Sequence, residues 1–302
     1  MGMFLRSHPK TAGSLLAVAG IHGLVVNLFI LHRVIYGRVF GKSFGRIWIS
    51  RGIAYIGITS LFAFYIPAVA FIDITLIDRG WTRVVPHIMM FYAILAIYSN
   101  FLIAINRCVM ISIPLKYKFL FCDLKTIIMI GCTWLISIGC VIPNLMDPCH
   151  HTPLHSNSSF FSIAPNCHYL INFFDLLVPT VPLASTIVVD LLAIFRLRKF
   201  VQLRRTMTSS RMVKLSRNRE LRLCCMILVQ AVISVYVYIS LGFAAFIDND
   251  FLEFLASTFT WGAVQAVDGI VVILFNTEMH TLRKNFPHPP RRISQDSFFS
   301  RW

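Results

Sequence analysis

The chain has 302 residues, of which 57% are apolar and only 14% are charged, and its mean hydropathy is +0.71. Soluble globular proteins carry about 25% charged residues, so this composition excludes an ordinary soluble domain and indicates a membrane protein. The formal net charge of +15 is compatible with a nucleic-acid partner or with an anionic membrane surface, and the positions of the basic residues distinguish the two.

Seven segments are apolar enough and long enough to cross a bilayer as helices, which takes about 20 residues each. No unit of about 20–50 residues repeats, which excludes a solenoid, and no long stretch alternates polar with apolar residues, which excludes a membrane barrel. We predict an all-α membrane protein, a bundle of seven transmembrane helices, over 12–36, 47–71, 84–110, 124–143, 169–195, 221–247 and 251–275.

Lysine and arginine are unevenly divided between the two ends of these spans. One side holds four of them, so the other 24 of the 28 fall in the remaining connections and the C-terminal tail. Because cytoplasmic connections carry the excess of basic residues, the N-terminus is predicted to be extracellular and the C-terminus cytosolic. We therefore expect the lipid bilayer of the plasma membrane, and not nucleic acid, to be the partner of these charges.

The first apolar segment differs from a cleavable signal peptide in two ways. It is longer than a typical signal-peptide core, and no convincing small-residue cleavage site follows it. We therefore expect 1–11 to form an extracellular tail, 12–275 to form the seven-helix domain, and 276–302 to lie in the cytosol.

The connection at 144–168 holds the two cysteines predicted to be extracellular, Cys149 and Cys167, and a glycosylation sequon that begins at Asn157. The other six cysteines lie in spans or face the reducing cytosol and are expected to be thiols. An extracellular pair favours a disulfide, which would stabilise the protein by about 3 kcal/mol in the chain-entropy model. The sequon predicts a glycan on Asn157.

Four histidines accompany these cysteines in the same connection, at 150, 151, 155 and 168. Histidine and cysteine together can bind zinc, but the spacing fits no usual zinc pattern. We expect solvated histidines beside a disulfide, and we expect no metal and no cofactor.

Two segments carry charged or amide side chains into apolar surroundings. Residues 105–117 read INRCVMISIPLKY, and residues 261–279 read WGAVQAVDGIVVILFNTEM. Asn106 and Arg107 close the third predicted span, and Asp268 lies deep in the last one. An ionisable group in hydrocarbon costs about 2.5–3.5 kcal/mol on insertion scales, so each one requires an explanation.

The first of these segments resembles the Asp-Arg-Tyr motif and following loop of class A (rhodopsin-like) G-protein-coupled receptors. Asp268-Gly269-x-x-Val272 stands in the place of their Asn-Pro-x-x-Tyr motif. GKSFGR at 41–46, Asn-Arg in place of Asp-Arg, and Asp-Gly followed by FNTE are similar to nematode serpentine chemoreceptors of class X (Srx). Further matches to the receptors are Asn27, Trp134, Pro143, Pro179 and Pro182.

The resemblance implies a G-protein-coupled chemoreceptor of sensory-cell membranes and no enzymatic activity. Such a receptor binds an external small molecule, here unknown, and signals through a heterotrimeric G protein. The resemblance also places Asn276 at the start of a short cytoplasmic eighth helix. It places Asp190 where receptors have a tyrosine that engages the arginine of the third helix, here Arg107.

Three departures from the receptor pattern affect these expectations. Thr82 stands where a cysteine usually bridges to the second outer loop, so Cys149 and Cys167 are the expected disulfide pair. The span at 221–247 contains no proline to make the usual kink. Asn106 replaces an acid and offers Arg107 only neutral hydrogen bonds, which are weaker than charge-assisted ones.

A restraint on Arg107 is therefore expected to come from another helix. Glu220, at the start of the sixth span, is the first candidate, and Asp190 is the second. Asp190 can equally be an acid that is paired only to make its burial tolerable.

Other polar residues inside the spans have a functional and a structural explanation. Asp268 and Asn27 are expected to share a buried network that acts in switching, or to serve only as contacts between helices. Trp134 is expected in the polar core of the fourth span. Arg51, near the inner end of the second span, is expected to extend to the lipid headgroups.

Five residues are candidates for contact with an external ligand. Asp175, in the outer half of the fifth span, would offer a counter-ion to a cationic ligand, and the weaker candidates are His22, His87, Trp261 and Gln265. For each of them an ordinary hydrogen bond within the bundle or at its rim is the alternative explanation.

Three alternative functions remain open from the sequence. A receptor-like protein without G-protein coupling would fit Asn106, Thr82 and the missing proline. A seven-helix transporter would be expected to show internal repeats, which are not apparent. A zinc-dependent membrane hydrolase would need histidine and aspartate clustered inside the bundle.

Overall fold

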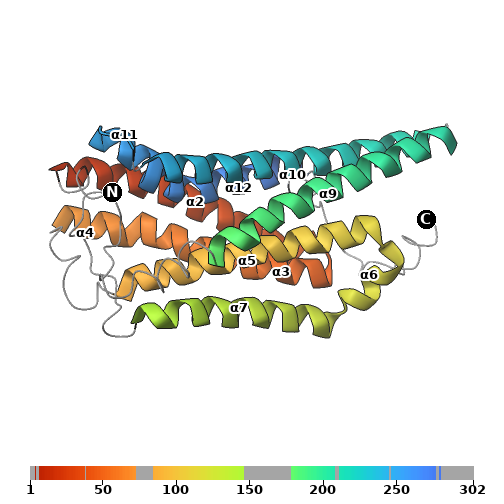
Figure 1. Ribbon diagram of the computed structural model, residues 1–302, viewed down its shortest axis with the longest axis horizontal. Coiled ribbons are helices and arrows are strands. Elements are labelled where there is room, and N and C mark those ends of the chain that lie inside the picture. The colour runs from red at the N-terminus through yellow and green to blue at the C-terminus, as the bar shows by residue number, and fades with distance from the viewer. Residues whose placement is uncertain are drawn as a thin grey trace.

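The computed structural model describes residues 4, 7–37, 39–72, 84–145, 178–207, 211–244, 246–276 and 279. Their helices are α2 (Pro9–Gly37), α3 (Lys42–Ser60), η1 (Leu61–Tyr65), α4 (Ile66–Ile72), α5 (Val84–Ser112), α6 (Pro114–Leu120), α7 (Asp123–Leu145), α9 (Val178–Met207), α10 (Arg211–Ala244), α11 (Asp250–Phe254), η6 (Leu255–Phe259) and α12 (Thr260–Phe275). The long helices run side by side and form one elongated bundle (Figure 1).

Seven rods make up this bundle, because α3, η1 and α4 form one continuous rod and α11, η6 and α12 form another. In the described part of the chain, six helical rods are long and apolar enough to cross a bilayer. The helix α10 adds a shorter apolar stretch, Leu228–Ala244. The predicted all-α bundle with seven membrane-crossing segments is confirmed.

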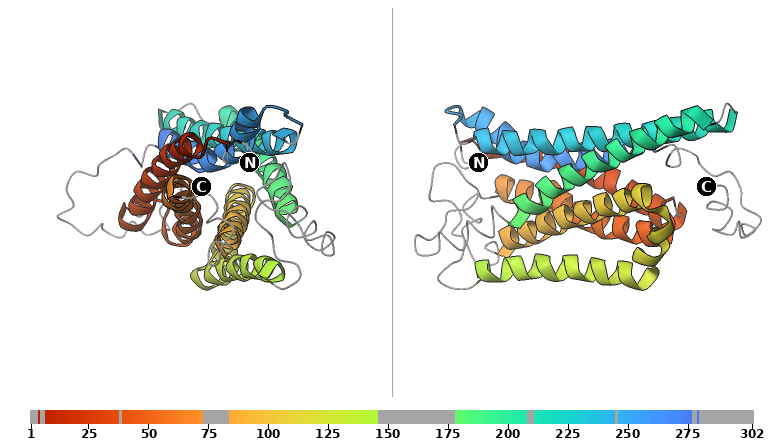
Figure 2. Two further views of the ribbon diagram at one scale, coloured as in Figure 1. Left: turned by 90° about the vertical axis from the view of Figure 1, so that its left-hand side faces the viewer. Right: turned by 45° about the vertical axis from the view of Figure 1, so that its right-hand side comes forward.

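Two helices continue well beyond their predicted spans at the α6 end of the bundle. The helix α9 runs on to Met207 and α10 begins at Arg211, so both project past the other helices (Figures 1 and 2). Hydropathy marks only the apolar parts of these helices, whereas arginine, lysine, leucine and methionine continue a helix in water. Residues 169–177 of the predicted fifth span lie outside the described residues.

The second rod begins earlier than predicted, at Lys42 and not at 47. Gly41 precedes it with a φ of 72°, a left-handed conformation that glycine adopts without steric cost. Starting the helix at Lys42 places Arg51 nine residues, or about 13 Å, inside the rod. Because of this earlier start, Arg51 is buried inside the bundle and does not lie near the end of the helix.

Glycines allow α2 to pack closely against two neighbouring rods. A Cβ at Gly20 would run into the backbone of Phe62 in η1, and one at Gly269 of α12 would lie 2.5 Å from Val26 Cγ1. Lipid provides no hydrophobic force between helices, so close backbone contact is a main source of their attraction. Gly20→Val would therefore separate α2 from the second rod.

Two rods contain a π-helical turn, in which an amide bonds to the carbonyl five residues back. The Ile66 amide bonds to Leu61 O at the end of η1, and the Thr260 amide bonds to Leu255 O at the end of η6. Single π turns are rare and frequently occur at functional sites.

Two large hydrophobic clusters fill the bundle, one towards each end, and a small third cluster contains Ile194 and Leu197 of α9. The cluster at the α4 and α11 end includes Phe62 and Phe254, and the cluster at the α6 end includes Trp48 and Val272. A layer of polar side chains lies between the two clusters and forms the site described next.

Candidate functional site: a polar network across the bundle

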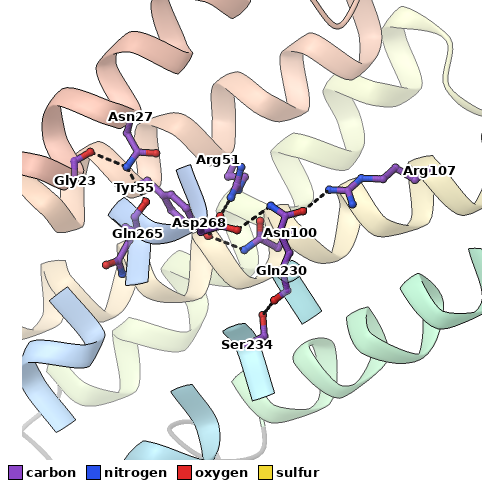
Figure 3. Close-up of polar contacts among 10 residues, drawn as sticks. All are labelled: Gly23, Asn27, Arg51, Tyr55, Asn100, Arg107, Gln230, Ser234, Gln265 and Asp268. Carbon is purple, nitrogen blue, oxygen red and sulfur yellow. Dashed lines mark hydrogen bonds and ion pairs between the residues drawn. The ribbon is translucent and has the colours of Figure 1, made fainter. Parts of the chain in front are cut away.

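A buried ion pair joins the second rod to the last one. Arg51 of α3 is 3% exposed and Asp268 of α12 is 7% exposed, and an Nη atom of the guanidinium contacts Asp268 Oδ2 (Figure 3). The guanidinium also lies 4.4 Å from the centre of the Trp48 ring and 4.5 Å from that of Tyr55. These rings flank Arg51 because residues three and four positions apart share a helix face.

The expectation that Arg51 extends to the lipid headgroups is wrong. Because the helix begins at Lys42, the guanidinium lies at the level of Asp268 inside the bundle and not at the membrane surface. A buried carboxylate without a counter-ion is strongly unfavourable, so pairing satisfies both charges at once.

Both oxygens of Asp268 also accept hydrogen bonds from neutral side chains. The Tyr55 hydroxyl donates to Oδ2 at 3.1 Å, and Gln230 Nε2 of α10 donates to Oδ1 at 2.8 Å. Asn100 Nδ2 of α5 donates in turn to the Tyr55 hydroxyl at 3.0 Å. Asp268 of α12 thus contacts α3 and α10 directly, and α5 is connected to it through the Tyr55 hydroxyl (Figure 3).

Gln230 extends this network towards Arg107. Its Oε1 accepts from Arg107 Nη2 at 3.4 Å while its Nε2 donates to Asp268 (Figure 3). One amide therefore connects the acid of α12 with the arginine that closes α5. A movement of α10 would therefore change the contact of Gln230 with Asp268 and its contact with Arg107 at the same time.

Arg107 is 5% exposed and faces Asp190 of α9 across a longer gap. Its Nη1 lies 3.9 Å from Asp190 Oδ1, which is within ion-pair range but too long for a hydrogen bond. Within the described part of the chain, Arg107 Nε, Arg107 Nη1 and Asp190 Oδ1 are buried without a hydrogen-bond partner. The structure thus places Asp190 beside Arg107 but leaves their contact loose.

Asn106, fully buried beside Arg107, contacts Tyr117 of α6 instead of the arginine. The Asn106 amide and the Tyr117 hydroxyl are joined by contacts of 3.4 Å in both donor directions. Burial raises the pKa of Tyr117, and the hydrogen bond with Asn106 opposes that rise. The hydroxyl therefore stays protonated at neutral pH and holds α6 against α5.

Asn27 and Trp134 tie two further rods to the same layer. Asn27 Nδ2 donates to Gly23 O at 2.8 Å and to Gln265 O of α12 at 3.3 Å, and it does so in place of a bond to Asp268. Trp134 Nε1 of α7 donates to Ser50 Oγ of α3 at 3.0 Å. Asp268 and Asn27 therefore lie in one polar layer, but Asn27 contacts the backbone of α12 and not the Asp268 carboxylate.

The comparisons with known proteins agree with this architecture. A family model described as "Serpentine type 7TM GPCR chemoreceptor Srx" matches residues 18–276. The chain belongs to this family. It is also 23% identical over 303 residues to Serpentine receptor class X 45 of Caenorhabditis elegans, in an alignment that covers 93% of this chain and 82% of that protein.

Membership makes the chain a multi-pass plasma-membrane protein of a chemosensory receptor family, which is not an enzyme class. The predicted resemblance to Srx receptors is confirmed. Among the described residues of this Srx receptor, no three side chains of histidine, cysteine, aspartate or glutamate gather as metal ligands.

The ligand candidates of this Srx receptor lie in different surroundings. His87 of α5 and Gln265 of α12 are buried, whereas His22 is exposed on α2 and its Nδ1 contacts Val18 O at 2.9 Å. Trp261 packs edge-on against Phe62 with 5.7 Å between ring centres. Gln265 Oε1 is buried without a hydrogen-bond partner in the described residues.

Several predicted residues of the Srx receptor lie outside the described part of the chain, namely Thr82, Cys149, Asn157, Cys167 and Asp175. Glu220 lies in α10, but its side chain is outside the described set. The helix α12 ends at Phe275, and Asn276 follows it in an extended conformation.

Sequence reasoning missed four members of the network, Arg51, Tyr55, Asn100 and Gln230. A usable signal existed for one of them, because a buried aspartate requires a cation and Arg51 is an arginine inside a predicted span. Tyrosine and the two amides carry no charge, so nothing in their spacing distinguishes them from ordinary helix residues.

Proposed function

We propose that this chain is a rhodopsin-like, G-protein-coupled chemoreceptor for an external small molecule, and that the polar network is its switch. The observation that carries the proposal is the double contact of Gln230, which bonds Asp268 of α12 and Arg107 of α5 with one amide. The interhelical bonds of Asn27 and Trp134 support the rhodopsin-like assignment, because both residues match the receptor pattern.

In the proposed resting arrangement, Asp190 and Gln230 hold Arg107 inside the bundle. Asn106 has no charge and contributes no ion pair, so the restraint lies on α9 and α10. A shift of α10 would withdraw Gln230 from both of its partners and release Arg107. Glu220 remains a proposed second restraint from the same helix.

An external ligand would favour one packing of the bundle over the other. It can do so only through its differential affinity for the two packings. His87, Trp261, Gln265 and Asp175 are the proposed contacts. Gln265 adds a buried acceptor that would pair with a hydrogen-bond donor of the ligand.

The proposed orientation places the α6 end in the cytosol. The helices α9 and α10 project from that end and carry exposed basic residues, Arg196, Arg198, Lys199 and Arg222. Their positive charge supports contact with anionic lipid headgroups and with a heterotrimeric G protein. A Cys149–Cys167 disulfide, a glycan on Asn157 and a cytoplasmic eighth helix after Asn276 belong to the same proposal.

The test is expression of the full chain at the cell surface with a G-protein readout and a chemical panel. At least one compound should produce a signal that Arg107→Ala abolishes while surface expression stays unchanged. A protein that reaches the surface and binds compounds but never couples would contradict the proposal and favour a receptor-like protein without coupling, to which Asn106 and the proline-free α10 point.

A further inference from the structure

The π turn η6 leaves one backbone carbonyl without its helical partner. In an α-helix the Thr260 amide would bond to Ala256 O, four residues back. It bonds instead to Leu255 O and Ser257 O, so Ala256 O is passed over. The Thr260 hydroxyl also donates to Leu255 O, at 2.7 Å, and this second bond favours the π arrangement.

A neighbouring helix supplies the missing donor. Ser240 Oγ of α10 donates to Ala256 O at 2.6 Å. Inside a membrane an unsatisfied carbonyl is costly, so non-α backbone persists only where another group of the protein satisfies it. The Ser240 hydroxyl therefore supplies the hydrogen-bond donor that allows the π turn to persist at Ala256.

The helix α10 thus bonds to the last rod at two levels. Ser240 bonds to Ala256 O in η6, and Gln230 bonds to Asp268 in α12. The two side chains are ten residues, or about 15 Å, apart along α10. A displacement of α10 acts on both bonds together.

We propose that η6 is a register switch set by α10, in which loss of the Ser240 bond converts the π turn into α-helix. Conversion returns the Thr260 amide to Ala256 O, and it turns α11 by about 100° and shifts it by about 1.5 Å relative to α12. Phe254 of α11 and Trp261 of α12 lie on either side of η6, so the direction of one side chain relative to the other changes by the same rotation. This inference rests on the proposed displacement of α10, and it connects that displacement to the opposite end of the bundle.

The rotation is measurable in the full-length protein in phosphatidylcholine nanodiscs. Keto amino acids carrying nitroxide labels would replace Leu252 of α11 and Leu135 of α7, both exposed, and leave the native cysteines intact. Double electron–electron resonance gives the distance between the labels. In Ser240→Ala a second distance should appear, shifted by about 5–8 Å, as expected for a helix of radius about 5–6 Å turned by about 100°.

Matched variants separate the switch from general damage. Ser240→Thr keeps the hydroxyl and should keep the original distance, whereas Thr260→Val should populate the second one if Ser240→Ala does not fold. Ser257→Ala is the control, because the Ser257 hydroxyl bonds to Glu253 O, four residues back, at 2.7 Å in ordinary helical geometry. It should leave the distance unchanged.

Gln230→Leu tests whether the Gln230–Asp268 bond and the Ser240–Ala256 bond are coupled through α10. The same second distance should appear, although this substitution lies ten residues from Ser240. An unchanged distance in Ser240→Ala, or an equal change in Ser257→Ala, would overturn the proposal. A change in Ser240→Ala without one in Gln230→Leu would make Ser240 a static brace and also overturn it. Full signalling by Arg107→Ala would remove the proposed function but leave these distances as they are.

Discussion

The two buried arginine–aspartate pairs, Arg51–Asp268 and Arg107–Asp190, share one bridging amide but differ in how closely they are held. Asp268 is fully engaged, with donors on both oxygens and a guanidinium set between two aromatic rings. The pair at Arg107 is separated by 3.9 Å, and Asp190 Oδ1 has no hydrogen bond in the described residues.

This difference separates a fixed contact from an adjustable one. Breaking the Arg51–Asp268 pair would leave two desolvated charges, although Arg51 Nε itself has no hydrogen-bond partner in the described residues. Rearranging the Arg107–Asp190 pair gives up little, because its atoms have not reached hydrogen-bond distance. We infer that the Arg51–Asp268 pair holds the second rod to the last one, and that of the two ion pairs only Arg107–Asp190 rearranges when α10 moves.

The largest expected effect comes from Arg51→Ala, which leaves Asp268 buried without its cation. The free energy of unfolding should fall by about 3–5 kcal/mol, measured by denaturant unfolding of the purified receptor, and surface expression should fall with it. Arg46→Ala is the control. Its ion pair with Asp123 spans 3.2 Å but is solvent-exposed, so it should cost at most about 1 kcal/mol. Equal losses in the two variants would contradict the distinction.

A smaller stability effect but a larger signalling effect is expected for Asp190→Asn. Because no hydrogen bond is lost at Asp190 Oδ1, the free energy of unfolding should fall by only about 1 kcal/mol. Weakening the hold on Arg107 by that amount should raise ligand-independent signalling about fivefold. A loss of stability as large as that of Arg51→Ala would show that the second pair is also a fixed contact.

Glu220→Gln tests whether α10 adds an acidic restraint. We expect it to raise ligand-independent signalling more than Asn106→Ala does, because a charged partner restrains an arginine more strongly than a neutral amide. Both variants are compared at equal surface expression in the same G-protein assay. The reverse order would place the restraint on α5 itself.

The smallest effect is expected for Tyr117→Phe, which removes the 3.4 Å contacts with Asn106. Stability should fall by about 0.5–1 kcal/mol and signalling should stay unchanged. Burial raises the pKa of Tyr117 above its ordinary value near 10, so its contribution is complete at neutral pH and decreases as the pH rises above that value. The difference between wild type and variant should therefore be constant from about pH 6 to 8.

The bundle could be predicted from the sequence because hydropathy and basic-residue positions are one-dimensional signals. The burial of Asp268 and Arg107 followed from their place inside apolar segments. The end of a helix is harder to read, and a shift of five residues in the start of α3 moved Arg51 from the expected headgroup region into the core.

The partners of these charges could not be predicted, because contacts between helices depend on how each rod is rotated and shifted against its neighbours. Gln230 and Asn100 are ordinary amides in a sequence, and only packing brings them to Asp268 and Tyr55. The π turn at η6 was equally invisible, since no proline or glycine lies within Leu255–Phe259 to mark it.

The placement of Arg51 and Asp268 on the second and the last rod has a consequence for biogenesis. During translation Arg51 enters the membrane long before Asp268 is synthesised, so nascent chains carry an uncompensated arginine, at a cost of about 2.5–3.5 kcal/mol on insertion scales. The charge is neutralised only when the seventh segment is released from the ribosome. Closure of the bundle therefore waits for the last rod, and quality control acting on unpaired membrane charges would retain receptors truncated before Asp268.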